Sequence, residues 1–268
     1  MLGQDLARTL AAAGYEVRPL ARRECDVLVL GDLAAAVDWA DVIVNCAAYT
    51  AVDRAESERD RAYAINADAV GRLGELATAK GRYVLHISTD FVYDGAQSRP
   101  YVETDATAPL SVYGASKLAG EQLLAASGCQ HATVRVEWTY GEYGDNFISK
   151  ILARARSAGS LTVVDDQVGA PSSTRQIATV LQALLRDRAE GLYLYADAGY
   201  ASRYEVAQFI VQHLGMDVPV TPCPSSTFVS PAARPLNSRF DCARLDATLS
   251  LTRPHWRDTL GPFLDTCT

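Results

Sequence analysis

The sequence predicts an α/β protein built on a doubly wound parallel sheet, with a smaller C-terminal lobe. In the first half, short β-branched apolar runs alternate with longer segments rich in Ala and Leu. Several of these runs are almost continuously apolar, as expected for parallel strands that helices cover on both faces. Beyond residue 145 this alternation weakens, and most of the chain's 11 prolines lie there. The two halves therefore predict different parts of one protein.

The elements follow from apolar periodicity and from glycines at helix ends. In order, we expect a helix over 5–13 before Gly14, a strand over 15–20, a helical turn over 33–37, a strand over 41–45, a helix over about 61–80 before Gly81, a strand over 82–88, a helix over 112–126 and a strand over 133–136. We expect 1–145 to form a dinucleotide-binding type of domain. The remainder, 146–268, is expected to be mainly a substrate lobe of loops, short strands and about three helices, with segments that return to the first domain.

Composition excludes several classes of protein. Lys and Arg number 25 against 32 Asp and Glu, a net charge of −7, which disfavours nucleic-acid binding. No apolar run approaches the ~20 residues of a membrane span, and the first residues do not resemble a secretory signal. The six cysteines are scattered without a C-x-x-C pair, so we expect no metal site and no disulfide framework. From composition we therefore expect an acidic cytoplasmic protein, and composition indicates nothing about its chemistry.

A Tyr and a Lys four residues apart are the central chemical feature. Tyr113 and Lys117 in Tyr-Gly-Ala-Ser-Lys share one face of the predicted helix over 112–126. A nearby ammonium favours the phenolate and would lower the pKa of Tyr113 by ~1–3 units. Tyr113 would then serve as a general acid at neutral pH. An exposed helix on which the two side chains meet by chance is the alternative.

Polar residues follow two of the predicted strands. Ser88, Thr89 and Asp90 end the strand over 82–88, where open α/β sheets bind ligands. Thr89 precedes Tyr113 by 24 residues, so the following loop and helix can bring the hydroxyl beside the phenol. A turn or capping cluster is the alternative explanation. The small residues of Asn-Cys-Ala-Ala-Tyr-Thr, 45–50, leave room for a ligand close to the backbone, or simply form a tight turn.

Two arginines lie just beyond the strand predicted over 15–20. Arg22 and Arg23 suit a ribose 2′-phosphate, although solvated surface charges are an equal alternative.

The chain is similar, over nearly its whole length, to the extended short-chain dehydrogenase/reductases and, within them, to the dTDP-4-dehydrorhamnose reductase family. The resemblance rests on six motifs: 44–56 (VNCAAYTAVDRAE), 88–95 (STDFVYDG), 103–117 (ETDATAPLSVYGASK), 138–141 (WTYG), 166–171 (DQVGAP) and 234–239 (RPLNSR). As a set these motifs are specific, especially 88–95 and 234–239.

The resemblance implies that NADP(H) transfers hydride to the 4-keto carbon of a dTDP-4-keto-6-deoxy sugar. Tyr113 would protonate the oxygen, Lys117 would hold the nicotinamide ribose, and Thr89 would bind the keto oxygen. The implied cofactor contacts are Leu2, Gly3, Arg22, Asp26, Val27, Ala48, Tyr49, Thr50, Ser88, Tyr113 and Lys117, and the implied substrate contacts are Thr89, Asp90, Trp138, Arg234 and Asn237. Ala21 stands where related chains often carry an acid, which with Arg22 favours NADP(H) over NAD(H). The resemblance leaves a homodimer open.

The N-terminus departs from the pattern that the resemblance implies. Met1 to Leu6 match only the end of the glycine-rich turn, and the first, central strand is absent. Without it, two rows of backbone groups would lack partners, at ~1–3 kcal/mol for each buried group, so a simple truncation should fold poorly. Two explanations stay open: translation starts upstream, or the sheet is naturally shortened and no longer binds a dinucleotide.

Two further departures concern the site. Glu137 stands where a small residue is usual, and points either into the site or to solvent. Ala233 replaces one of two arginines expected before Pro235, so a diphosphate would lose one contact. Two alternatives to a reductase follow: a non-redox enzyme on the same scaffold that uses Tyr113, Asp90 or Glu137 as acid or base, and a non-catalytic nucleotide-binding regulatory subunit.

Overall fold

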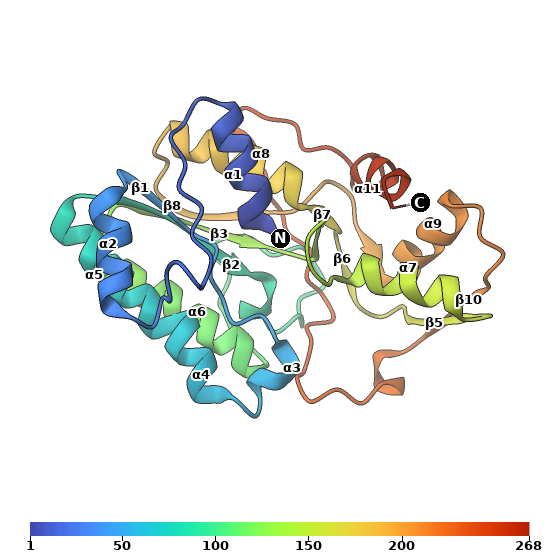
Figure 1. Cartoon of the computed structure of the whole chain (residues 1–268). Helices are drawn as coiled ribbons and strands as arrows, with labels where there is room; N and C mark the ends of the chain where they lie inside the picture. The colour runs from blue at the N-terminus through green and yellow to red at the C-terminus, as the bar shows by residue number, and fades with distance from the viewer. Residues whose placement is uncertain (268) are drawn as a thin grey trace.

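The computed structural model describes residues 1–267 and contains the expected doubly wound sheet at its centre (Figure 1). Its four strands lie in the order β1-β2-β3-β8, and every neighbouring pair is parallel. They are β1 (Val42–Asn45), β2 (Tyr83–Thr89), β3 (His131–Val136) and β8 (Gly191–Tyr195). Since parallel strands need crossover connections, helices cover both faces. The predicted fold class is confirmed.

Alternate residues of β2 show how the two faces are packed. Val84 points into a cluster with α2, α5 and α6, whereas Leu85 points into a cluster with α1 and α8. Figure 1 shows these two helix layers on opposite sides of the sheet. The helices are α1 (Leu2–Ala12), α2 (Leu30–Trp39), α5 (Ala69–Lys80), α6 (Val112–Ala126) and α8 (Thr174–Arg186).

The long helix expected over about 61–80 is interrupted. It consists of α4 (Arg59–Tyr63), a π-helical turn η1 (Ala64–Asp68) and α5, which ends at Gly81 with a left-handed φ of 61°. A π-helical turn within a helix often marks a functional site, because it redirects one side chain. Here it carries Asn66, which is fully buried.

The strand expected over 15–20 is wrong. This segment is irregular and largely exposed. Helix α1 begins at Leu2, and among the described residues no strand precedes it or pairs with the second edge of β1. A strand needs a neighbour for its backbone hydrogen bonds. Because the described sheet begins at β1, the segment over 15–20 has no neighbouring strand to pair with.

The remaining elements form the C-terminal lobe and the connections. Its core packs α7, α9 and α11 around Trp256, on the right of Figure 1. Five α-helices follow residue 145 in the described part of the chain, more than the three expected, because α8 and α10 adjoin the first sheet. The elements not yet named are α3 (Val52–Ala55), η2 (Asp90–Val92), β4 (Thr139–Tyr140), α7 (Phe147–Ser157), β5 (Leu161–Val164), β6 (Val168–Gly169), β7 (Ser172–Ser173), β9 (Ala201–Ser202), α9 (Arg203–His213), β10 (Val220–Cys223), η3 (Ser225–Thr227), α10 (Ala243–Leu249) and α11 (Trp256–Asp265).

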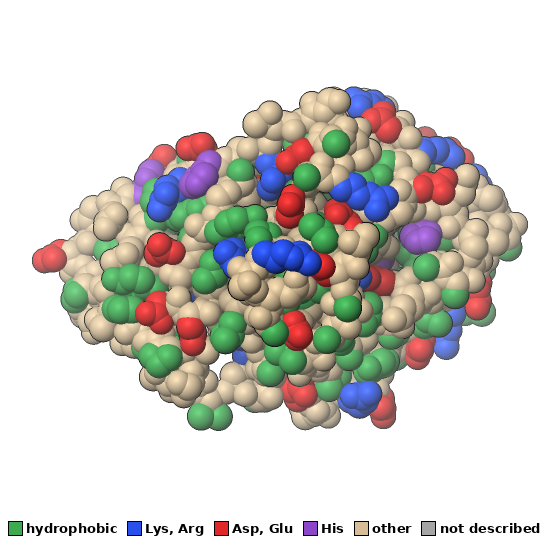
Figure 2. Space-filling model, turned by 180° about the vertical axis from the view of Figure 1, so that it is seen from behind, with side chains coloured by type: hydrophobic (Ala, Val, Ile, Leu, Met, Phe, Trp, Pro, Cys, Tyr) green, Lys and Arg blue, Asp and Glu red, His purple; other side chains and the backbone are tan. Residues whose placement is uncertain are grey.

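The surface mixes charges of both signs. Figure 2 shows Lys and Arg side chains interspersed with Asp and Glu side chains on the face opposite to that of Figure 1. Within 1–267, no helix combines the length and apolar character that crossing a membrane requires. Over the same residues, no group of three or more His, Cys, Asp and Glu side chains is arranged to hold a metal ion.

Candidate active site at the carboxyl ends of the strands

Tyr113 and Lys117 lie on the first turns of α6, as the sequence predicted. Ser111 caps this helix, since its hydroxyl accepts a hydrogen bond of 3.1 Å from the Gly114 backbone N–H. Tyr113 is half-buried and Lys117 is only 3% exposed, so α6 turns this face toward the sheet. The spacing of four residues therefore places both side chains at one inward-facing site.

Close backbone approaches hold α6 in place. A Cβ atom at Gly114 would overlap the Phe91 carbonyl oxygen, and one at Gly120 would overlap the Asn66 carbonyl oxygen. The Tyr113 ring meets the Phe91 ring edge-on, with centroids 5.5 Å apart at 78°. Glycine within the Tyr-Gly-Ala-Ser-Lys motif therefore serves packing, because it lets Tyr113 reach the end of β2.

Thr89 and Asp90 form the carboxyl end of β2. The Thr89 hydroxyl donates to Asp90 Oδ1 at 3.1 Å, and Asp90 Oδ2 accepts from the Ser238 hydroxyl at 2.6 Å. Both residues are buried, and burial raises the pKa of Asp90. Ser88 Oγ is also buried but has no hydrogen-bond partner within 1–267. The Ser88 hydroxyl is therefore free to meet a ligand.

The expected lowering of the Tyr113 pKa is wrong. Burial raises the pKa of Tyr113 to about 12, although its hydrogen bond with Thr89 lowers it in part. Lys117 Nζ does not point at the phenol: it donates to the Ile87 carbonyl oxygen at 2.6 Å and lies 3.4 Å from His86 Nε2. Burial lowers the pKa of Lys117 to about 8. Tyr113 thus stays protonated at neutral pH, as a proton donor requires.

The loop after β1 lies beside α6. Asn66 joins them: its Oδ1 accepts from the Tyr49 N–H at 2.8 Å, while its Nδ2 donates to the Tyr49 carbonyl and to Ser116 Oγ. Tyr49 OH donates to Glu58 at 2.9 Å, and Ala48 and Thr50 flank it. The expected cofactor residues 48–50 therefore lie next to the helix that carries Tyr113 and Lys117.

The first turn of α1 packs against the end of β1. A Cβ at Gly3 would contact Cys46 Cβ at 3.5 Å and its Sγ at 3.8 Å, while Leu2 packs on the sheet core. A helix N-terminus at this position presents free backbone N–H groups. Leu2 and Gly3 thus lie near the carboxyl end of the sheet, as their expected role requires.

Arg22 and Asp26 lie in a turn away from this cluster. Arg22 Nε and Asp26 Oδ2 form an ion pair at 3.2 Å, and Asp26 Oδ1 accepts from the Leu28 N–H at 3.1 Å. The Arg22 side chain is 68% exposed, and Val27 is half-buried. Among the described residues neither charge contacts Tyr113 or Lys117, so the structure does not join these three residues to the group around Tyr113, and their cofactor contacts stay predictions.

Trp138 and Glu137 follow β3. Trp138 has a φ of 44°, unusual for a bulky residue, and the Arg203 guanidinium stacks 3.5 Å from the centroid of its ring. Glu137 is fully buried, which rules out the solvent-facing alternative. Neither of its carboxyl oxygens has a hydrogen bond within 1–267, and burial raises its pKa well above the usual value. Nearby Asp90 raises that pKa further.

The 234–239 motif is tied to neighbouring loops. Arg234 forms an ion pair with Asp53 at 2.9 Å, which joins the loop to α3. Asn237 Nδ2 donates to the Gln97 and Arg99 carbonyls, both at 2.8 Å, and its Oδ1 accepts from Arg239. These bonds use both amide hydrogens of Asn237 to fasten the loops, and the substrate contact expected of Asn237 stays a prediction.

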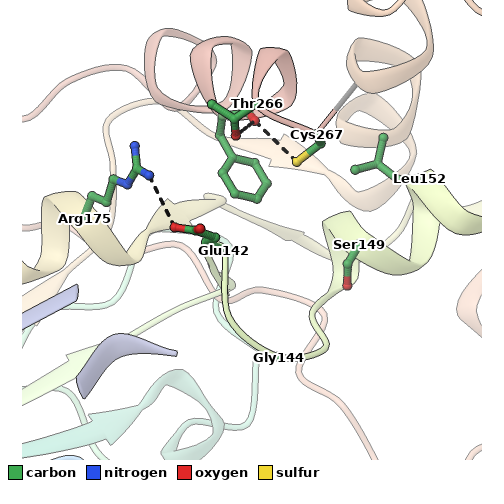
Figure 3. Close-up of a pocket in the computed structure, with 9 residues that line it drawn as sticks. Glu142, Gly144, Ser149, Leu152, Arg175, Thr266 and Cys267 are labelled. Atoms are coloured by element: carbon green, nitrogen blue, oxygen red, sulfur yellow. Dashed lines mark hydrogen bonds and ion pairs between the residues drawn. The ribbon is translucent and has the colours of Figure 1, made fainter. Parts of the chain in front are cut away.

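A cavity of about 350 Å³ lies away from Tyr113. Figure 3 shows it between α7, α8 and α11, where Glu142 faces Arg175 at 3.6 Å. Its lining consists of Gly141, Glu142, Gly144, Ser149, Leu152, Arg175, Phe263, Thr266 and Cys267. None of these is a site residue that the sequence predicted.

A parallel doubly wound sheet with Tyr113 and Lys117 at its carboxyl edge defines the class: an oxidoreductase of the extended short-chain dehydrogenase/reductase type. The family model described as "RmlD substrate binding domain" matches residues 1–268. A protein named dTDP-4-dehydrorhamnose reductase from Sinorhizobium fredii is 37% identical over 262 residues, which cover 93% of this chain and 88% of that protein. One from Burkholderia thailandensis is 39% identical over 280 residues, covering 97% and 93%.

Solved structures agree. A dTDP-4-dehydrorhamnose reductase from Clostridium acetobutylicum superposes with a TM-score of 0.96 at 33% identity, and one from Bacillus anthracis in complex with NADP with 0.95 at 32%; each alignment covers 99% of this chain and 95% of that structure. The chain belongs to the dTDP-4-dehydrorhamnose reductase family. The predicted class, an NADP(H)-dependent sugar-nucleotide ketoreductase, is confirmed at the level of the family.

Sequence reasoning missed two residues of this site. His86 was hidden in an apolar strand, where a lone polar residue was the available signal. Arg203 is the first residue of α9 and carried no signal, because only the fold brings α9 beside Trp138.

Proposed function

We propose that this protein reduces the 4-keto group of a dTDP-4-keto-6-deoxy sugar with NADPH. The observation that carries the proposal is the placement of Tyr113, Lys117 and Thr89 at one carboxyl edge of the sheet, in a chain of this family. The unpartnered Ser88 hydroxyl and the first turn of α1 fit a nicotinamide dinucleotide at this edge. When bound, NADPH supplies the hydride.

Tyr113 donates the proton in this proposal. Hydride addition to the keto carbon places a negative charge on the oxygen, and the phenol transfers its proton there as the C–H bond forms. Thr89 hydrogen-bonds the same oxygen and holds it near the phenol. Lys117 binds the nicotinamide ribose, and its burial excludes water from the reacting atoms.

Trp138 and Arg203 form one wall of the proposed sugar pocket. The stacked guanidinium has no hydrogen-bond acceptor among the described residues, so its N–H groups are available to sugar or phosphate oxygens. The charge of Arg234 acts on Arg203, and the neighbouring Ala233 adds no second charge. Asp90 holds the pocket together through Ser238.

The proposed division places the dinucleotide on residues 1–145 and the sugar mainly on 146–268. Arg22 would meet the 2′-phosphate, a contact that requires it to leave Asp26, and this would favour NADP(H) over NAD(H). A cytoplasmic location and a homodimer are proposed as well.

Two measurements test the proposal. NADPH binding should quench the fluorescence of the three tryptophans, and NADPH should be consumed with the dTDP-4-keto sugar. Tyr113→Phe should keep NADPH binding but lower turnover ~10²–10⁴-fold, since it removes only the proton donor. Absence of NADPH binding, or a fully active Tyr113→Phe variant, would refute the proposed reduction. Turnover without a cofactor would favour the non-redox enzyme, and NADPH binding without turnover would favour a regulatory subunit.

A further inference from the structure

His86 is a buried polar residue that the proposed reaction does not use. It lies in the middle of β2 and is fully buried, on the face of the sheet that α6 covers. Both ring nitrogens nevertheless have partners: Nδ1 lies 3.2 Å from Asn45 Nδ2, and Nε2 lies 3.4 Å from Lys117 Nζ. A buried imidazole with two nitrogen neighbours must adopt a definite protonation state.

Asn45 determines which ring nitrogen carries the hydrogen. The Ala47 backbone N–H donates to Asn45 Oδ1 at 3.1 Å, so the amide group of Asn45 turns its N–H toward His86. His86 Nδ1 must then accept. Burial is the largest cause that holds the pKa of His86 well below its usual value, so the ring is neutral whichever form Lys117 takes. A neutral ring that accepts at Nδ1 carries its only hydrogen on Nε2.

The hydrogen on Nε2 points at Lys117 Nζ. Lys117 Nζ already donates one hydrogen to the Ile87 carbonyl oxygen at 2.6 Å. An ammonium group has three N–H donors and no acceptor, so it would meet the His86 N–H donor to donor. A neutral amine has a lone pair that accepts from His86 Nε2–H, and keeps a second hydrogen for a ligand. The neutral amine therefore satisfies the observed geometry.

We propose that His86 is a positioning residue for Lys117: held by Asn45 as the Nε2–H tautomer, it directs Lys117 Nζ and favours its neutral amine form. The proposal rests on the proposed function only for its role in catalysis. In that role, the chain Ala47–Asn45–His86 orients the lysine toward the cofactor ribose and sets the pH at which it becomes charged.

Other groups face Lys117 as well. Glu121, one turn further along α6, favours the ammonium, but its charge is shared with Arg135 at 2.6 Å. Cys46, after β1, acts in the same direction only as a thiolate, and burial raises its pKa to about 11. Tyr113 is protonated below pH ~11, given its pKa of about 12. Since burial lowers the pKa of Lys117 to about 8, its charge changes within the working range of an enzyme.

The protonation states can be measured on the protein alone by ¹⁵N and ¹³C NMR. The chain has four histidines and three lysines, so the resonances are few. Lys80→Arg and Lys150→Arg assign the lysines, and His86→Gln assigns the histidine. We expect His86 as the Nε2–H tautomer and Lys117 titrating near pH 8. An Nδ1–H tautomer or an imidazolium at His86 would overturn the proposal.

Asn45→Asp provides the second arm and changes a half-buried residue, which limits the effect on folding. The carboxylate would accept from Nδ1–H and reverse the tautomer, so that Nε2 accepts from the lysine ammonium. The pKa of Lys117 should then rise by ~1 unit or more. If the double variant Asn45→Asp, His86→Leu shows the same rise in the pKa of Lys117, the rise comes from the added charge alone and the proposal is overturned. An unchanged pKa of Lys117 in Asn45→Asp would also overturn it. His131→Gln, on the neighbouring strand, is the matched control and should leave Lys117 unchanged.

The pH profile of kcat/KM links these states to catalysis. The limb assigned to Lys117 should move to higher pH in Asn45→Asp and stay in place in His131→Gln. A limb that does not follow the NMR titration would refute the positioning role. Because the NMR experiments need neither cofactor nor sugar, a protein with the predicted titrations but no reductase activity would refute the proposed function and leave the His86 tautomer standing.

Discussion

Glu121 and Arg135 form an ion pair inside the first domain, and Glu121→Ala would break it. The guanidinium donates to both carboxylate oxygens, at 3.0 and 2.6 Å, and the two side chains are only 9% and 5% exposed. Arg135 also donates to the Tyr93 hydroxyl at 2.6 Å. After the substitution, Tyr93 would be the only hydrogen-bond partner left to this buried cation among the described residues.

The expected cost follows from this burial. Removing one partner of a buried, bidentate pair leaves an uncompensated charge, and the free energy of unfolding should fall by ~3–5 kcal/mol. Glu121→Gln keeps one acceptor and should cost less, ~1–3 kcal/mol. Glu142 offers the matched control: it is 51% exposed and lies 3.6 Å from Arg175 and 3.7 Å from Arg8. Glu142→Ala should cost at most ~1 kcal/mol.

Urea denaturation of the three variants and the parent measures these differences. A cost for Glu121→Ala within ~1 kcal/mol of that for Glu142→Ala would refute the argument from burial. Removing the Glu121 charge should also act on the site, because this charge favours the ammonium form of Lys117. Glu121→Gln should therefore move the Lys117 titration to lower pH, and an upward shift would contradict this placement of the charges.

Three further predictions concern single side chains. The folded-state pKa of Glu137 is raised, so its contribution to stability is complete below the ordinary pKa of 4.5 and is lost as pH rises toward the folded value. The parent protein should therefore lose unfolding free energy between about pH 5 and pH 8, and Glu137→Gln should lose less over the same range. An equal loss in both proteins would contradict this prediction. Gly114→Ala places a methyl against the Phe91 carbonyl and should cost ~1–3 kcal/mol and reduce turnover, whereas a fully active, equally stable variant would show that the contact can relax. Asn237→Ala leaves the Gln97 and Arg99 carbonyls without this donor and should lower the free energy of unfolding, measured in urea, by ~1–3 kcal/mol. A raised KM at unchanged stability would instead indicate a direct contact with the sugar.

Much of the fold was predictable because its signals are local. The apolar runs of β2 and β3, and the glycine after α5, depend on neighbouring residues and were confirmed within a few positions. The strand expected over 15–20 failed for the opposite reason. Its residues suit a strand, but a strand exists only if another pairs with it, and the described sheet begins at β1.

The sequence by itself determined which residues could do the chemistry. Helical spacing placed Tyr113 and Lys117 on one face, and strand ends placed Thr89 and Asp90 at the carboxyl edge of the sheet, because these relations depend on chain geometry alone. Only the tertiary structure decided their states. Burial raised the pKa of Tyr113 against the expected effect of Lys117, since the lysine bonds to β2 instead. The partners of a buried polar atom come from segments distant in the chain, and their spacing in the sequence does not reveal them.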